Sequence, residues 1–292
     1  MPLPETVSIT SGPFSARLRP AWGGRMTHLT HAEFGNILVP TNADVFEPWN
    51  WPKAGAYPLF PYHNRLYGAC FAHAGVSHDV LPHPLLALDA MHGPAHRRPW
   101  RVARQADDQA TLRLDYEADA EWPFAFEARQ SFSLAEHGLT VELTITNRAS
   151  VAAPVALGWH PYFVAGLDRD VWTDASLAYA LDPFDVPTGN PPLPRPQASL
   201  PAKSGYTQHL MNWSTARIHL DVGCQLVLSA DPVFHHLAAH RTENYMCLEP
   251  VSMAAGTLRQ PEHQRTDLGL TILQPGDSLT GKIRLHIQSM LE

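Results

Sequence analysis

The chain has 292 residues, of which 45% are hydrophobic and 17% are charged, and its formal net charge is −7. Soluble domains carry about 25% charged residues and about 5% proline, so this chain is poor in charge and, with 27 prolines, rich in proline. Interior prolines break helices, which excludes a helical bundle or a coiled coil, while the apolar content is sufficient for a core and argues against disorder.

Alternation of apolar and polar residues, which is typical of half-buried strands, recurs in chain order. It is clearest over residues 111–116, 124–132 and 139–147. Ala135-Glu136-His137-Gly138 lies between the last two runs and predicts a hairpin turn. Shorter runs of strand type follow later in the chain, at 217–222, 225–229, 246–249, 268–273 and 279–287.

Two stretches favour irregular structure. Residues 182–201 are dense in proline, and residues 40–62 hold prolines and aromatic residues that include Trp49, Trp51 and Tyr57. A turn is predicted at Pro275-Gly276-Asp277. Since no window of helical length shows an apolar stripe, we expect an all-β protein, a large antiparallel β-sandwich or barrel formed by residues 1–292 as a single domain.

Seventeen histidines raise the question of a metal site. Three close pairs occur, His78/His83, His92/His96 and His235/His236, but Pro94 lies inside the second pair and no H-E-x-x-H motif is present. The spacing gives no positive signal, so we predict no metal and no organic cofactor.

Four segments stand out as places for chemistry. The first carries Asn64 and Arg65 after a loop of prolines and aromatic residues, and the second is His92 before Gly93, where a ligand can approach the backbone. In the third, His160 lies at the end of an apolar run and directly before a proline. The fourth ends an apolar strand with Glu249, whose burial is costly without a partner.

Taken in order, these segments resemble the aldose 1-epimerase (galactose mutarotase-like) family. The resemblance runs through Asn64-Arg65, His92-Gly93 and Gly158-Trp159-His160-Pro161-Tyr162-Phe163 to Glu249-Pro250 and the closing 273–279 segment. It implies a supersandwich of the family's type, with a sugar bound in a cleft across one sheet.

The resemblance also implies roles. His160 matches the family's general acid and Glu249 its general base, while Asn64, Arg65 and His92 match residues that bind the sugar. We expect an ionised Glu249 and a protonated His160, each charge favouring the other.

One position departs from the family. Many members carry an aspartate that holds sugar hydroxyls, but residues 205–213 contain no acid. Gln208, His209 or Asn212 could replace it, and we take Gln208 as the candidate. The sugar preferred is therefore left open.

Aromatic rings near the motifs could stack on the apolar face of a pyranose. Trp159, Tyr162 and Trp49 are the candidates for this contact. For each of them, packing in the core is the alternative.

Three rival functions remain. A mutarotase for hexose 6-phosphates needs cations for the phosphate, for which Arg65, Arg97 and Arg98 are candidates. A non-catalytic sugar-binding protein on the same fold would not require a matched acid and base. A metal-dependent enzyme of cupin type would require clustered histidines with a glutamate.

Compartment and partners follow from what the sequence lacks. Residues 1–5 show no secretory signal, and no apolar run approaches the roughly 18 residues of a membrane span. Cys70, Cys224 and Cys247 are widely spaced, which fits reduced thiols. Without a polybasic run, nucleic acid is a poor partner. We expect a cytoplasmic monomer or homodimer whose partner is a small-molecule aldose.

Overall fold

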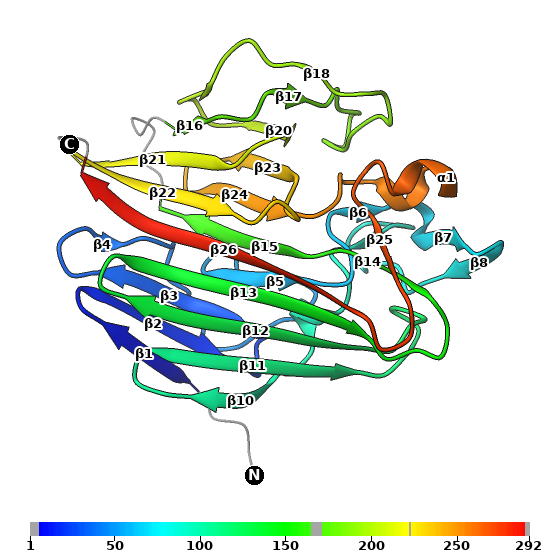
Figure 1. Ribbon diagram of the computed structural model, residues 1–292, viewed down its shortest axis with the longest axis horizontal. Coiled ribbons are helices and arrows are strands. Elements are labelled where there is room, and N and C mark those ends of the chain that lie inside the picture. The colour runs from blue at the N-terminus through cyan, green and yellow to red at the C-terminus, as the bar shows by residue number, and fades with distance from the viewer. Residues whose placement is uncertain (1–5, 165–170, 222, 290–292) are drawn as a thin grey trace.

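The computed structural model describes residues 6–164, 171–221 and 223–289. Two large antiparallel sheets lie face to face across a shared core (Figure 1). Among the described residues, the larger sheet has 11 strands in the order β1-β2-β3-β5-β15-β24-β23-β20-β17-β18, with β4 paired to β3. The other has nine, in the order β10-β11-β12-β13-β26-β22-β21-β16-β19. This confirms the predicted all-β sandwich.

The strands of the 11-stranded sheet are β1 (Val7–Ser11), β2 (Phe14–Arg19), β3 (Arg25–His31), β4 (Gly35–Asn36), β5 (Ala56–Leu59), β15 (Gly158–Phe163), β17 (Leu177–Ala178), β18 (Leu193–Pro194), β20 (Tyr206–Met211), β23 (His236–Arg241) and β24 (Met246–Val251). The strands of the nine-stranded sheet are β10 (Arg101–Gln105), β11 (Gln109–Tyr116), β12 (Phe126–Ala135), β13 (Gly138–Asn147), β16 (Val171–Thr173), β19 (Ser199–Leu200), β21 (Thr215–Asp221), β22 (Cys224–Ala230) and β26 (Ser278–Ser289).

Short elements lie at one end of the sandwich. They are the strand pairs β6 (Arg65–Leu66) with β9 (Ala90–Met91), β7 (Cys70–His73) with β8 (Val76–Asp79) and β14 (Ala153–Val155) with β25 (Thr271–Leu273), the 3₁₀ turns η1 (Tyr67–Ala69), η2 (Ala95–Arg97) and η3 (Thr257–Arg259), and α1 (Glu262–Arg265). In the described part of the chain, no helix has the length and apolar character needed to cross a membrane.

Most predicted strands and both predicted turns are present. The hairpin turn at 135–138 joins β12 to β13, which pair from Ala135↔Gly138 to Phe126↔Asn147. The predicted strand 268–273 is wrong in its first half, since only β25 forms. The prediction for 217–222 holds as far as β21 extends, and Val222 lies outside the described residues.

The two predicted loops contain strands. Residues 40–62 include β5, which pairs with β3 and β15 inside the large sheet. All four β5 residues are buried, so the sequence shows no alternation of apolar and polar residues there. Pro58 also argues against a strand, because proline has no N–H to donate to a neighbouring strand. The 182–201 loop is mostly irregular, as predicted, but carries the short β18 and β19.

Alternation along the central strands separates the core from the opposite face of the 11-stranded sheet. Trp159 on β15 and Met246 and Leu248 on β24 belong to the main core. Their neighbours Tyr162 and Cys247 belong to a second, smaller buried cluster on the other face. Because successive side chains of a strand point to opposite faces, His160 and Glu249 share that second face.

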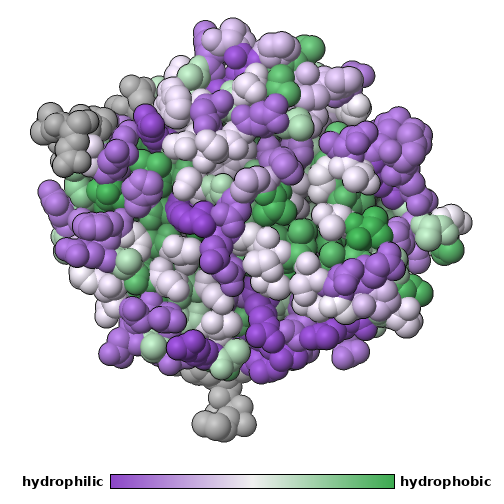
Figure 2. Space-filling view, viewed as in Figure 1, coloured by the Kyte–Doolittle hydropathy of each residue, from purple (hydrophilic) through white to green (hydrophobic). Residues whose placement is uncertain are grey.

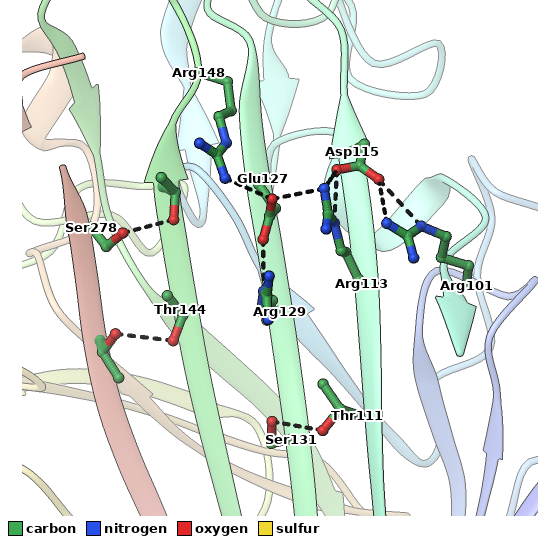
Figure 3. A network of polar contacts seen from close by, with 12 residues as sticks. Arg101, Thr111, Arg113, Asp115, Glu127, Arg129, Ser131, Thr144, Arg148 and Ser278 are labelled. Atoms are coloured by element: carbon green, nitrogen blue, oxygen red, sulfur yellow. Dashed lines mark hydrogen bonds and ion pairs between the residues drawn. The ribbon is translucent and has the colours of Figure 1, made fainter. Parts of the chain in front are cut away.

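A polar network covers the solvent face of the nine-stranded sheet. Figure 3 shows Glu127 on β12 between Arg113, Arg129 and Arg148, at 2.8, 2.6 and 2.9 Å. The side chain of Glu127 is only 2% exposed. Burial opposes its ionisation, but hydrogen bonds from Arg129 and Arg148 hold the pKa of this carboxyl below its usual value.

The surface is mainly hydrophilic in the view of Figure 2, with a hydrophobic area on the side of β7, β8 and β25. An apolar pocket of 470 Å³ is lined there by residues that include Phe124, Val151, Leu270 and Ile272. None of the predicted site residues lines it.

Candidate active site

His160 and Glu249 face each other from neighbouring central strands. β15 pairs with β24 through Gly158↔Val251 and Tyr162↔Cys247, and the two residues lie midway between these pairs. His160 Nε2 is 3.3 Å from Glu249 Oε1, and both side chains are less than 10% exposed. The imidazole packs against two neighbouring aromatic rings, with the Tyr57 and Tyr162 centroids each 4.7 Å away.

Burial favours the neutral form of both groups. It raises the pKa of Glu249 to about 8. It also lowers the pKa of His160 well below its usual value, an effect reinforced by the neighbouring His92 and Lys53 side chains. These shifts run against the prediction of an ionised pair. We infer that the pair holds one proton, which sits on Glu249.

His92 is fixed as a neutral hydrogen-bond donor. Its ring Nδ1 accepts the backbone N–H of Asn64 at 3.0 Å, and the backbone N–H of His92 donates to the Asn64 carbonyl at 3.0 Å. Desolvation lowers the pKa of His92 well below its usual value, so the single ring proton lies on Nε2. The next residue must be glycine, because a Cβ on Gly93 would lie 2.3 Å from the carbonyl oxygen of Phe60.

Arg65 is held beside His92 by the short β6–β9 ladder, in which it pairs with Met91. Its Nη1 donates to Asp89 Oδ2 at 2.7 Å, and its guanidinium lies 4.9 Å from the ring centroid of Phe184. The charge of Arg65 is therefore balanced by Asp89 within the protein.

The structure does not bring Gln208 to this cluster. On β20, Thr207 and His209 line the pocket with Glu249, whereas Gln208 points to the other face and lines a separate pocket beside Tyr179. Alternation along the strand is the physical reason. Asn212, just beyond the end of β20, lines neither pocket.

An acid that sequence reasoning missed reaches the pocket from the proline-rich loop. The Asp185 carboxylate accepts a hydrogen bond from the Thr207 hydroxyl at 3.0 Å, and the Asp185 backbone carbonyl oxygen lies 3.1 Å from His209 Nε2. Its backbone is left-handed, with φ at 61°. The only signal for it was an Asp-Pro-Phe-Asp-Val-Pro run of turn-forming residues.

The cleft has two lobes. The acid–base lobe, about 250 Å³, is lined by Asn64, Arg65, Met91, His92, His160, Phe184, Asp185, Thr207, His209, Ala238, His240 and Glu249. The tryptophan lobe, about 340 Å³, is lined by Trp49, Asn50, Trp51, Lys53, Tyr57, His83, Leu85, Leu86, Met91, His92, His160, Tyr162, His240, Tyr245 and Cys247. Met91, His92, His160 and His240 line both lobes, so the lobes adjoin.

Of the three aromatic residues predicted to stack on a sugar, two lie in the cleft. Tyr162 and Trp49 line the tryptophan lobe. Trp159 does not, because it is fully buried in the sandwich core on the other face of β15. The prediction for Trp159 is wrong, and the core alternative holds.

The arginines considered for a phosphate are already paired with acids. Arg97 donates through Nε to Glu121 at 3.0 Å, and Arg98 pairs with both Asp119 and Glu121 at 2.6 Å. Neither lines either lobe.

One group in the described chain has the residue types of a metal site. A ligand atom from each of His160, Cys247 and Glu249 lies within 4.8 Å of the others, and all three residues are buried. Burial, then the charge of Glu249, raises the pKa of the Cys247 thiol well above its usual value. The thiol is therefore protonated, which makes it a poor ligand unless a metal displaces the proton.

Comparison with known proteins identifies the family of this chain. The sequence profile of the aldose 1-epimerase family matches residues 5–286, so the chain belongs to that family. Its relatives in Escherichia coli K12 include the uncharacterized proteins YphB, 26% identical over 80% of this chain and 84% of YphB, and YihR, 27% identical over 63% of this chain and 59% of YihR.

Solved structures show the same fold. A galactose mutarotase-like protein from Clostridium acetobutylicum superposes with a TM-score of 0.86 at 18% identity, covering 97% of this chain and 95% of its own. The Slr1438 protein from Synechocystis superposes with a TM-score of 0.80 at 25% identity, covering 98% and 96%. The suggested galactose mutarotase-like fold is thus confirmed.

Proposed function

We propose that the protein is an aldose 1-epimerase, which interconverts the α and β anomers of an aldose by opening and reclosing the ring. The observation that carries the proposal is the buried His160–Glu249 contact of 3.3 Å inside a cleft that Asn64, Arg65 and His92 also line. Positioned acids and bases contribute about 10²–10⁴-fold each to such proton transfers. No metal or organic cofactor is required.

Ring opening needs one proton taken from the C1 hydroxyl and one given to the ring oxygen. The single proton of the pair moves to His160 when the sugar binds, which leaves Glu249 as the carboxylate base. Glu249 then accepts the hydroxyl proton, C1–O5 breaks as C1=O forms, and His160 protonates O5. After rotation about C1–C2, the same transfers run backwards on the other face.

Other residues hold the sugar. His92 offers its Nε2 proton to a sugar oxygen, and Arg65, oriented by Asp89, donates to hydroxyls. Asp185 supplies the acidic acceptor that residues 205–213 lack. Asn64 fixes His92 through its backbone and Arg65 through its side-chain oxygen, which accepts the Arg65 N–H at 2.7 Å.

The test measures anomer exchange by NMR saturation transfer across common aldoses, with Glu249→Gln and His160→Asn as variants. We expect each variant to lose at least about 10²-fold in kcat. Glu142→Gln, on the nine-stranded sheet, is the matched control. Normal exchange in Glu249→Gln would sink the assignment, and saturable sugar binding without exchange in the wild type would favour the non-catalytic sugar-binding alternative.

A further inference from the structure

The proposed acid and base lie beside a thiol. Cys247 and Glu249 are two residues apart on β24, so their side chains point to the same face of the sheet. His160 faces Glu249 from the neighbouring β15. A ring nitrogen of His160, the Cys247 sulfur and a carboxylate oxygen of Glu249 all lie within 4.8 Å of one another, and all three residues are buried. The thiol has no part in the proposed proton transfers.

The spacing of these atoms suits a tetrahedral zinc ion. Bonds of about 2.0–2.1 Å to nitrogen and oxygen and about 2.3 Å to sulfur place the nitrogen and oxygen ligands about 3.3 Å apart and the sulfur about 3.6 Å from each. His160 Nε2 and Glu249 Oε1 are already 3.3 Å apart. The Cys247 sulfur, within 4.8 Å of a ligand atom of each residue, has to approach by roughly 1 Å. An ion between these atoms would take the place of the proton that His160 and Glu249 share.

The cleft gives an ion access to these ligands. His160 lines both lobes, Glu249 lines the acid–base lobe and Cys247 lines the tryptophan lobe. The side chains of His160 and Glu249 are 9% and 8% exposed, so an ion in the acid–base lobe reaches this pair first.

Charge is balanced in the complex. A Cys247 thiolate, a Glu249 carboxylate and a neutral His160 supply two negative charges, which match the charge of Zn²⁺ and leave no net charge buried. The ion displaces two protons, one from the thiol and one from the His160–Glu249 pair, and both pass to solvent.

The ligand types select the ion and the strength of the site. Thiolate and imidazole favour zinc, whereas calcium and magnesium take oxygen ligands. Three protein ligands leave the fourth tetrahedral position to water. Metal-ligating histidines almost always donate their other N–H to an acceptor, but His160 Nδ1 has no hydrogen-bond partner among the described residues. This difference favours a reversible site over a permanent one.

We propose that His160, Cys247 and Glu249 form a reversible zinc site that inhibits the enzyme. Zinc engages the general acid and the general base at once, so ring opening stops until the ion leaves. Sugar and zinc compete for the same nitrogen and oxygen, and saturating sugar therefore protects the enzyme. The inhibition rests on the proposed function, whereas the binding of the ion does not.

The activity test measures anomer exchange at buffered concentrations of free Zn²⁺. We expect micromolar zinc to lower kcat/KM at least about tenfold, EDTA to restore it, and Mg²⁺ or Ca²⁺ to leave it unchanged. Cys247→Ala and Cys247→Ser should each weaken the inhibition at least about tenfold, relative to the metal-free rate of the same variant. Cys70→Ala removes an exposed thiol on β7 and is the matched control, which should keep the zinc sensitivity of the wild type.

Two results of this test overturn the inference. They are a wild type that zinc does not inhibit, and equal zinc sensitivity in the wild type and both Cys247 variants. In either case the exchange measured without zinc still supports the proposed function.

Binding is measured separately from turnover with Co²⁺, which takes the ligands of zinc and absorbs light strongly when a thiolate coordinates it. We expect a thiolate-to-cobalt charge-transfer band in the wild type and in Cys70→Ala, its loss in Cys247→Ala, and its displacement by Zn²⁺. If no sugar exchanges, the proposed function fails, and this band still supports the metal site. Absence of the band in the wild type, or its persistence in Cys247→Ala, overturns the site whatever the exchange rate.

Discussion

A single proton shared by His160 and Glu249 governs the chemistry of the cleft. Burial pushes the pKa of Glu249 up to about 8 and that of His160 down. Two groups this close titrate as one unit. The unit carries one proton between the lowered pKa of His160 and the raised pKa of Glu249, about 8. The pair is electrically neutral whether that proton lies on Glu249 or on His160.

The pH dependence follows from that range. We expect kcat/KM to stay level below the usual histidine pKa of 6.5 and to fall above pH 8 or so, where the pair loses its last proton and no acid remains for the ring oxygen. The measurement is saturation-transfer NMR from pH 5 to about 9.5, with the hydroxide-catalysed background subtracted. A rate that climbs through pH 8 would show instead that a free carboxylate alone limits catalysis.

At the level of elements, the loop between β17 and β18 builds one wall of the acid–base lobe. Asp182 organises it, since its carboxylate accepts the N–H groups of Phe184 and Val186 at 2.9 and 3.1 Å and the Tyr67 hydroxyl at 2.7 Å. The turn thereby holds Asp185 in its left-handed conformation beside the lobe.

Loosening this loop should weaken sugar binding more than chemistry. We expect Asp182→Ala to raise KM about tenfold with a much smaller change in kcat, because the Asp185 carboxylate loses its fixed position. Asp185→Asn should show the same split. Asp174→Ala is the matched control, because Asp174 accepts N–H groups of Ser214 and Thr215 in a turn outside both lobes. A loss confined to kcat in Asp182→Ala would argue against this role.

The sequence predicted elements well wherever local pattern decides them. The β12–β13 hairpin is an example, since alternation and a turn are both written in consecutive residues. It failed for β5, where pairing with β3 and β15 overrides Pro58. It also failed for Asp185, because only the folded loop brings that residue to β20, and for Gln208, because the register of β20 was unknown.

In the candidate site too, the sequence predicted what short motifs decide but not what depends on the folded chain. Short motifs were enough to nominate His160, Glu249, His92 and Arg65, which the structure brings to one lobe. Their protonation could not be foreseen, because it depends on burial produced by the whole cleft. Whether the chain folds as one domain and where it resides in the cell stay predictions.

At the scale of the whole molecule, the two sheets serve different purposes. The 11-stranded sheet carries the cleft, and the nine-stranded sheet turns the polar network of Figure 3 to solvent. Glu127 is the centre of that network, with arginines from β11, β12 and the segment after β13 around it.

Removing the charge of Glu127 should destabilise the fold without touching the cleft. We expect Glu127→Gln to lower the free energy of unfolding by about 2 kcal/mol at pH 7, a value at the modest end because the arginines are partly exposed. The folded pKa of Glu127 is lowered, so this stabilisation is present above the unfolded pKa of about 4.3 and is lost as pH falls through the folded pKa.

Urea unfolding of wild type and variant at pH 7 and about pH 3 measures the difference. Glu142→Gln is the control, since the exposed Glu142–Lys282 pair at 3.3 Å contributes little. A gap between wild type and Glu127→Gln that stays constant with pH would contradict the ion-pair explanation.

The alternation of β15 has a consequence for how this protein can change. Trp159 and His160 are adjacent in sequence, yet one packs in the core and the other faces the cleft. Substitutions at cleft-facing positions can therefore alter the shape and chemistry of the cleft while leaving core packing intact. Natural variation or design can therefore change the cleft-facing side chains, and with them ligand preference, at little cost in stability.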